Sequence, residues 1–218
     1  MSEPVKDRCR LALCVSPEAA NVDTLSTCLA GGDVACVLFY AADAPDAKFQ
    51  RFVEAGVPVV QAAGVAAIVC DDTRLAGRSD ADGIHLEKSI GDLSDIIARF
   101  SPHKSVGCGG MMDRHRALQL GELNPDYLLF GKVGGDIKPE PHPKNLALGE
   151  WWAEFVEIPG MVMAGSSIES VVDVAARRVD FVLAGKAVFA PDVDSRDAVS
   201  RINALLDEFA PDLAEEQE

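Results

Sequence analysis

Eight short apolar runs, separated by stretches of helical character, constrain this chain more than any other feature of its sequence. The runs are LALCV (11–15), VACVLFY (34–40), AAIVC (66–70), GIHL (83–86), SVGCG (105–109), YLLFG (127–131), MVMAG (161–165) and FVLAG (181–185). Continuous apolar runs of this length are typical of strands that are buried on both faces of a parallel sheet. The sequence therefore predicts eight parallel strands joined by helices.

The segments between the runs carry apolar residues at helical spacing. Pro17 is expected to open the first helix, and Pro58 is expected to start a further turn after a helix over 46–55. Asp113 is expected to cap a helix that contains Leu118. Further helices are expected over 92–100, 145–156, 167–177 and 195–209.

Eight strand–helix alternations without a break in composition favour an α/β fold, a single-domain (β/α)8 TIM barrel. A doubly wound open sheet is the alternative that the same alternation leaves open. We expect the barrel to span residues 1–210 and the acidic end, 211–218, to be a solvated tail. A chain of 218 residues, 48% of them hydrophobic, is long enough to bury such a core.

The formal net charge of −15 limits the partners that this chain can bind. An acidic surface repels the phosphate backbone of nucleic acid and anionic membranes, so the sequence predicts neither as a partner. The first residues, MSEPVKDRCR, contain no apolar signal core, which predicts a cytoplasmic protein. The six cysteines form no C-x-x-C pair. Cys14, Cys36 and Cys70 lie inside apolar runs and are expected to be free and buried, with disulfides or a zinc site as the alternative.

Small residues follow the last two predicted strands, where Gly165-Ser166 and Gly185-Lys186 stand. In barrels of this kind phosphate often binds after strands seven and eight, against main-chain N–H groups at a helix N-terminus. Gly165, Ser166, Gly185 and Lys186 are therefore predicted to bind a small phosphorylated metabolite. The alternative is that these residues merely turn the chain and cap the helix.

Two other segments are expected at the same end of the barrel. Asp71 and Asp72 follow the third run and are candidates to hold Mg²⁺, which prefers one or two carboxylates with diphosphate oxygens. The alternative is that one caps the next helix while the other is solvated. The loop 132–145, KVGGDIKPEPHPKN, is expected either to act as a lid with Lys138 on a phosphate, or to be simply solvated. His85, a lone histidine in a short strand, is expected to be a core residue, and the alternative is a ligand.

These residues resemble the thiamine-phosphate synthase family. The family has a strand that ends in Asn-Asp, a short helix and an A-D-G-hydrophobic-His pattern, and this order is similar to AAIVCDDTRLAGRSDADGIHL (66–86). The later strands and phosphate turns of the family are similar to PDYLLFG (125–131), EIPGMVMAGSSIESV (157–171) and VDFVLAGKAVF (179–189). The resemblance implies a barrel transferase of thiamine biosynthesis. Such an enzyme binds a hydroxymethylpyrimidine diphosphate with Mg²⁺ and a thiazole phosphate, whose nitrogen displaces pyrophosphate.

The chain departs from the family pattern at charged positions. Asp71 matches the family's first metal-binding aspartate, but Cys70 replaces the preceding asparagine and Ile90 stands at the second metal aspartate. The Gln-x-Arg-x-Lys set that grips the diphosphate is replaced by VLFYAADAP (37–45), and Lys138 lies one place from the family lysine. Loss of one preorganised electrostatic contact can cost roughly 10²–10³ in rate.

Three interpretations follow from the resemblance. The first is a divergent thiamine-phosphate synthase, and the second is a non-catalytic phosphate-metabolite binder of the same family that has lost the diphosphate chemistry. The third is a relative of thiazole tautomerase, whose catalytic histidine falls near Met111 in this chain. Because family members are often dimers or trimers, the resemblance also leaves a homo-oligomer open.

Overall fold

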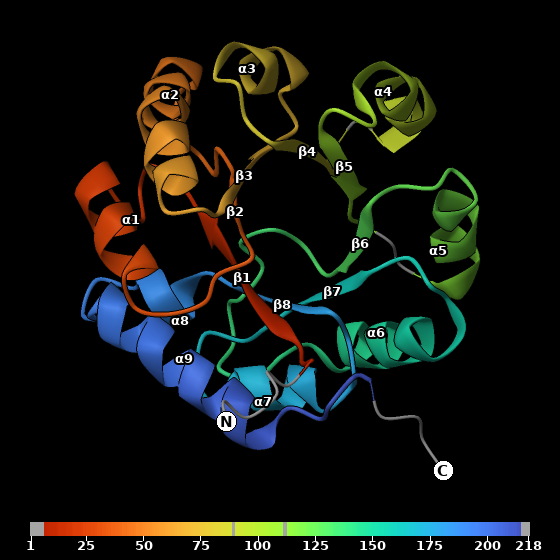
Figure 1. Ribbon diagram of the computed structural model, residues 1–218. Coiled ribbons are helices and arrows are strands. Elements are labelled where there is room, and N and C mark those ends of the chain that lie inside the picture. The colour runs from red at the N-terminus through yellow and green to blue at the C-terminus, as the bar shows by residue number, and fades with distance from the viewer. Residues whose placement is uncertain (1–6, 89, 111–112, 215–218) are drawn as a thin grey trace, which may run out of the picture.

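The computed structural model describes residues 7–88, 90–110 and 113–214, which form a closed barrel of eight parallel strands surrounded by helices (Figure 1). The strands follow chain order around the barrel, and β8 pairs with β1 to close it. The strands are β1 (Arg10–Val15), β2 (Cys36–Phe39), β3 (Ala66–Cys70), β4 (Gly83–Leu86), β5 (Ser105–Cys108), β6 (Tyr127–Phe130), β7 (Gly160–Met163) and β8 (Phe181–Ala184). The predicted (β/α)8 barrel is confirmed, and the open-sheet alternative is wrong.

The helices lie between the strands in the predicted order. They are α1 (Val22–Leu29), α2 (Asp46–Ala62), α3 (Thr73–Arg78), α4 (Leu93–Phe100), α5 (Arg114–Gly121), α6 (Pro143–Phe155), α7 (Ser170–Ala175), α8 (Lys186–Phe189) and α9 (Ser195–Phe209), and a 3₁₀ turn, η1 (Ile90–Asp92), precedes α4. Helix α1 begins after Pro17 because Asn21 caps it, accepting a hydrogen bond of 2.8 Å from the Thr24 amide. Helix α2 continues through Pro58, since its buried stripe extends on both sides of this exposed proline.

Alternate strand residues fill the interior of the barrel. The barrel-interior cluster consists of Ala12, Cys14, Cys36, Leu38, Ile68, Cys70, Tyr127, Leu129, Val133, Met161, Met163 and Leu183. At Gly107 of β5 the space is taken by Tyr127, because a Cβ there would lie 2.2 Å from the tyrosine ring. The interior is therefore a packed core rather than a channel. All six cysteines are free and buried, which confirms the prediction for Cys14, Cys36 and Cys70.

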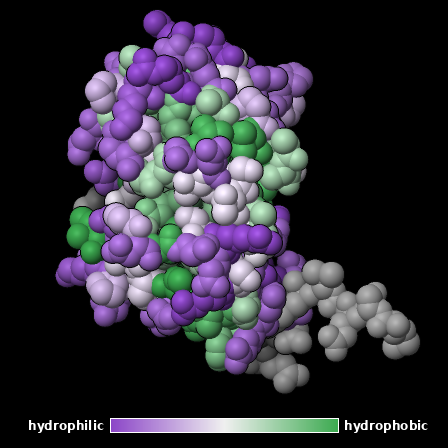
Figure 2. All heavy atoms as spheres, turned by 90° about the vertical axis from the view of Figure 1, so that its left-hand side faces the viewer, coloured by the Kyte–Doolittle hydropathy of each residue, from purple (hydrophilic) through white to green (hydrophobic). Residues whose placement is uncertain are grey.

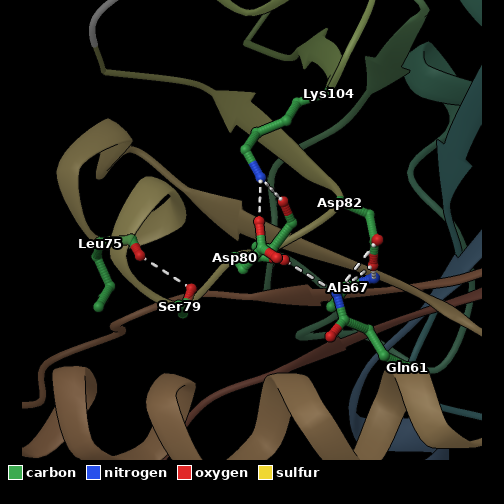
Figure 3. Close-up of polar contacts among 8 residues, drawn as sticks. Gln61, Ala67, Leu75, Ser79, Asp80, Asp82 and Lys104 are labelled. Carbon is green, nitrogen blue, oxygen red and sulfur yellow. Dashed lines mark hydrogen bonds and ion pairs between the residues drawn. The ribbon is translucent and has the colours of Figure 1, made fainter.

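Three aspartates stabilise the rim of the barrel at which the strands begin. Asp82, Asp126 and Asp180 directly precede β4, β6 and β8. Each accepts a hydrogen bond from an amide at the start of the preceding strand, with donors Ala67, Val106 and Gly160 at 2.8, 2.6 and 2.7 Å. Figure 3 shows the first of these contacts, in which Gln61 also donates to Asp82. The aspartate of the Ala81-Asp82-Gly83 motif is thus structural, because unpaired strand amides are costly.

Helices α1, α2 and α9 cover one side of the barrel (Figure 1). Figure 2 faces that side and shows hydrophilic residues over much of the surface, with hydrophobic residues in patches between them. Across the described ranges, no helix has both the length and the apolar character needed to cross a bilayer. Near the chain ends, Leu213 donates a hydrogen bond of 2.6 Å to the Asp7 carbonyl. Residues 211–214 of the predicted solvated tail lie within the described part of the chain, and 215–218 lie outside it.

Candidate active site at the barrel mouth

The carboxyl ends of the eight strands form one rim of the barrel, which we call the mouth. Parallel strands place every strand-to-helix loop at this rim, and catalytic residues of such barrels come from these loops. The longest is the β6–α6 loop, residues 131–142, which crosses the middle of the ring of strands (Figure 1). Its Val133 belongs to the barrel-interior cluster, so the loop enters the barrel rather than lying over it.

Asp71 and Asp72 follow β3 at the mouth and have different roles. Asp71 Oδ1 accepts hydrogen bonds from the amides of Glu87 and Lys88 at 2.8 and 2.9 Å. Asp72 Oδ1 accepts from Leu75 at 2.8 Å and caps α3, as one alternative predicted. Asp71 has a φ of 58°, a left-handed conformation that is uncommon outside glycine and is found at functional sites.

The residues around Asp71 bear on whether a metal ion could bind there. Ile90 lies in η1, so the second carboxylate of the family pattern is missing there. Within the ranges that the structure describes, no three His, Cys, Asp or Glu side chains are grouped as metal ligands. Mg²⁺ commonly binds through one or two carboxylates together with substrate phosphates. Asp71 therefore fits a Mg²⁺ ion that a diphosphate helps to hold, and does not fit one held by protein ligands alone.

His85 lies inside the barrel next to the mouth and is fully buried. Its Nδ1 lies 3.0 Å from the Tyr127 hydroxyl, and the two rings stack with centroids 5.6 Å apart. Burial raises the pKa of Tyr127 well above its ordinary value, so this hydroxyl is neutral near pH 7. His85 Nε2 has no hydrogen-bond partner and lies 3.9 Å from Glu87 Oε1. The contacts place His85 in the core, as expected.

The end of β2 presents an aromatic residue where the family pattern has cations. Tyr40 packs against Gly134 of the β6–α6 loop, and a Cβ on Gly134 would lie 2.6 Å from the Tyr40 hydroxyl. Gly134 has a φ of 72°, so glycine is required there for both conformation and space. Burial raises the pKa of Tyr40, and the neighbouring Cys14 and Asp136 raise it further. The phenol is thus neutral near pH 7 and supplies no charge for a diphosphate.

The turns after β7 and β8 both contact the β6–α6 loop. The amide of Ser166 donates to the Lys138 carbonyl at 2.7 Å, and the amide of Lys186 donates to Asp136 Oδ2. The amide of Gly165 donates to Ser170 Oγ at 3.0 Å. The structure therefore brings the predicted phosphate-binding residues to one end of the barrel, and each of these three amides has a protein partner.

Two predicted cations lie at this site with their side chains in solvent. The side chains of Lys138 and Lys186 are exposed, and the contacts that they make to the turns use main-chain atoms. Gly185 is buried, and a Cβ added there would lie 2.9 Å from Cys14 Sγ and 3.0 Å from Asp136 Oδ2. The β8 turn therefore approaches the loop so closely that only glycine fits at position 185.

Sequence reasoning missed Asp136, which is 2% exposed and contacts the β8 turn. An acidic residue in a loop rich in Gly, Pro and Lys is usually solvated, so its burial had no local signal. It also missed Glu87, whose Oε1 accepts a hydrogen bond of 2.8 Å from the Val133 amide. Both residues act across the mouth, between segments far apart in the sequence. Met111, named for the tautomerase interpretation, lies outside the described residues.

A cavity of about 710 Å³ lies away from the mouth. Its lining includes Glu150, Arg177 and Asp180, and Asp180 stands at the start of β8, on the opposite rim. None of the residues predicted to bind phosphate or metal lines this cavity. The mouth therefore remains the candidate active site.

The fold and the site define a single-domain (β/α)8 barrel whose mouth carries a carboxylate beside β3 and main-chain donors after β7 and β8. The family model described as thiamine monophosphate synthase matches residues 11–188, so the chain belongs to that family. The thiamine-phosphate synthase of Rhodospirillum centenum is 32% identical over 204 residues, which cover 91% of this chain and 98% of that protein. That of Hyphomonas neptunium is 28% identical over 214 residues, which cover 94% and 97%.

Solved structures share the fold at lower identity. The thiamine phosphate pyrophosphorylase of Pyrococcus furiosus superimposes with a TM-score of 0.76 at 18% identity, covering 95% of this chain and 100% of the other. A 3-hexulose-6-phosphate synthase superimposes with a TM-score of 0.68 at 17% identity, covering 90% of this chain and 99% of the other. At these identities the similarity supports the barrel architecture and does not choose a reaction.

Proposed function

We propose that this chain joins a hydroxymethylpyrimidine diphosphate to a thiazole phosphate and releases pyrophosphate, as a divergent member of its family. The observation that carries the proposal is the family match over 11–188, which runs from the first strand into α8 and so includes every loop of the mouth. The relative from Rhodospirillum centenum supports it, because its named activity is attached to a chain of the same extent.

The reaction needs one bond made and one bond broken. The thiazole nitrogen forms a C–N bond with the methylene carbon of the pyrimidine, while the C–O bond to the diphosphate breaks and pyrophosphate leaves with the electron pair. The protein's contribution is to position the two substrates and to stabilise the leaving charge.

Named residues divide this work between two sides of the mouth. On the β3 side, Asp71 would hold Mg²⁺, which would neutralise part of the diphosphate charge when it is bound. On the opposite side, the amides of Ser166 and Lys186 are the proposed donors to the thiazole phosphate, and Gly165 and Gly185 leave room for it once the β6–α6 loop atoms that occupy these turns have moved. Lys138, exposed on the β6–α6 loop, is the proposed additional cation.

Because this chain lacks several charged residues of the family pattern, we expect the condensation to be slow. Residues 39–41 present Phe-Tyr-Ala where the family pattern has a Gln-x-Arg-x-Lys set, and Ile90 replaces a metal ligand. Each lost electrostatic contact costs roughly 10²–10³ in rate. The same observation favours a second candidate function, a phosphate-metabolite binder without turnover, because the neutral Tyr40 phenol cannot neutralise the charge of a diphosphate.

One assay separates these functions. Purified protein is incubated with Mg²⁺ and both substrates, and thiamine phosphate and pyrophosphate are quantified, with Asp71→Asn as the control variant. The synthase is supported by equal amounts of both products, formed faster by the wild type than by Asp71→Asn. Calorimetric binding of thiazole phosphate without any product would support the binder instead. If neither binding nor product is found, the proposed function is wrong.

A further inference from the structure

Asp136 is a buried carboxylate without a counter-charge. It is 2% exposed, its Oδ2 accepts a hydrogen bond from the Lys186 amide, and its Oδ1 has no hydrogen-bond partner. Among the described residues no Lys, Arg or His forms an ion pair with it. Burying a carboxylate in this way is costly, so such a group calls for a functional explanation.

The position of this carboxylate supplies that explanation. A main-chain amide on the turn after β8 is a common donor to bound phosphate in barrels of this fold. The Asp136 carboxylate already occupies that donor, and it packs against Gly185, whose missing side chain allows an anion to approach the turn. An anionic side chain thus sits where the proposed function places a ligand's anion.

The rest of the loop occupies the neighbouring turn in the same manner. The Lys138 carbonyl accepts from the Ser166 amide at 2.7 Å, and the Pro139 carbonyl accepts from the Ser167 amide at 3.3 Å. A Cβ on Gly165 would lie 2.0 Å from the Pro139 oxygen, so the loop backbone leaves no room at this turn for a ligand. Oxygen atoms of one loop thus use donors on both turns at once.

We infer that the β6–α6 loop is an internal plug, in which Asp136 takes the place of a ligand's phosphate and must leave before a phosphorylated metabolite binds. The inference deepens the proposed function and rests on its phosphate site. Two anions cannot share one amide, so ligand and Asp136 compete. The apparent ligand affinity is then the intrinsic affinity multiplied by the fraction of protein in the unplugged state.

The attachments of the loop suit such a movement. Its start is held by the bond from Val133 to Glu87, and its end by His142, whose Nδ1 accepts from Lys144 at the start of α6. Between these points lie Gly134, with a φ of 72°, and Ile137, which is 77% exposed. Gly134 contacts Tyr40 and Cys14, and Gly135 and Ile137 donate hydrogen bonds within the loop. The remaining described hydrogen bonds of this middle part, at Asp136, Lys138 and Pro139, are made to the two turns.

The test compares Asp136→Ala and Asp136→Asn with wild type and with Glu140→Ala. Glu140 is an exposed acid of the same loop, so its variant controls for the loss of one negative charge. Thermal melts establish that each variant is folded, and calorimetry measures binding of inorganic phosphate and of thiazole phosphate. We expect both Asp136 variants to bind at least about tenfold more tightly than wild type, and Glu140→Ala to match wild type.

Hydrogen exchange provides a readout that does not depend on catalysis. We expect peptides covering 132–142 to exchange faster in Asp136→Ala, and faster in wild type once phosphate is added. Equal phosphate affinity in wild type and Asp136 variants, or no binding by any of them, overturns the plug. An Asp136 variant that binds phosphate more tightly but makes no thiamine phosphate leaves the plug standing and counts against the synthase.

Discussion

Glu87 Oε1 accepts a hydrogen bond of 2.8 Å from the amide of Val133, which joins the loop after β4 to the loop after β6. The two residues are 46 positions apart in the sequence. The same oxygen lies 3.9 Å from His85 Nε2, so one carboxylate connects the barrel interior with the loop that fills the mouth. The Glu87 carboxylate therefore anchors the start of the β6–α6 loop. Glu87 is itself positioned by the hydrogen bond that its backbone amide donates to Asp71 Oδ1.

Removing the Glu87 carboxylate should loosen that start. Glu87→Ala leaves the Val133 amide, on a residue only 5% exposed, without its acceptor, which costs about 1–3 kcal/mol. Glu87→Gln keeps a carbonyl acceptor and should cost less. Urea unfolding measures the stability, and hydrogen exchange follows the Val133 amide. If both variants lose the same stability and Val133 stays protected in both, the bond does not hold the loop.

Gly107 should tolerate no side chain. A Cβ there would lie 2.2 Å from atoms of the Tyr127 ring, which is buried and bonded to His85, so the ring cannot move away freely. We expect Gly107→Ala to cost about 1–3 kcal/mol by overpacking. Gly77→Ala is the matched control, because no atom lies within 4 Å of its new Cβ and it sits in α3, where alanine should stabilise by about 0.5–1 kcal/mol. Thermal melts of both variants decide, and a Gly107→Ala protein as stable as wild type would contradict the packing.

Much of the fold could be predicted because burial on both faces leaves a direct sequence pattern. The run 66–70 became β3, the run 83–86 became β4 and the segment 195–209 became α9, all with the predicted bounds. Two features were not predicted correctly. Helix α1 starts later than Pro17 because Asn21 caps it, and α8, which directly follows β8, is too short to show a periodic pattern.

The candidate site was less predictable because its contacts are long-range. Asp71 and the glycine turns could be found, since each follows an apolar run directly. The partners of those groups could not be found, since Asp136 reaches Lys186 across 50 positions of sequence. A hydrogen bond between two loops has no periodicity and no composition signal. The contact forms because β6, β7 and β8 are neighbouring parallel strands whose loops lie at one rim of the barrel.

The buried thiols should be unreactive in the folded protein. Burial raises the pKa of Cys9, Cys28, Cys36 and Cys108 to about 12, and raises that of Cys14 and Cys70 as well. Because the thiolate is the reactive form, we expect no rapid reaction with a disulfide reagent at about pH 8. All six should react after unfolding in guanidinium chloride. A single fast thiol in the native protein, located by mass spectrometry, would show that the barrel opens locally.

Asp180 should make stability fall as the pH rises. Burial raises the pKa of this carboxyl, and the hydrogen bond donated by the Gly160 amide only partly opposes the shift. A carboxyl with a raised folded-state pKa holds its proton more tightly when folded, so its contribution is full below about pH 4 and is lost as the pH passes the folded pKa. Asp180→Asn keeps an oxygen acceptor for Gly160 and removes the titration. We expect it to gain stability relative to wild type on going from about pH 4 to pH 7.

The neighbouring aspartates after β3 should separate binding from stability. Asp72→Ala removes the cap of α3 and should cost about 1 kcal/mol, while leaving the mouth intact. Asp71→Asn keeps an acceptor for the amides of Glu87 and Lys88 but removes the charge, so the fold should persist while Mg²⁺-dependent binding of inorganic pyrophosphate weakens by about tenfold or more. Calorimetry with and without Mg²⁺, paired with thermal melts, measures both effects on the same samples. Pyrophosphate binding that is lost in Asp72→Ala and kept in Asp71→Asn would place the cation on the other carboxylate, and equal binding in both variants would remove Asp71 from the site.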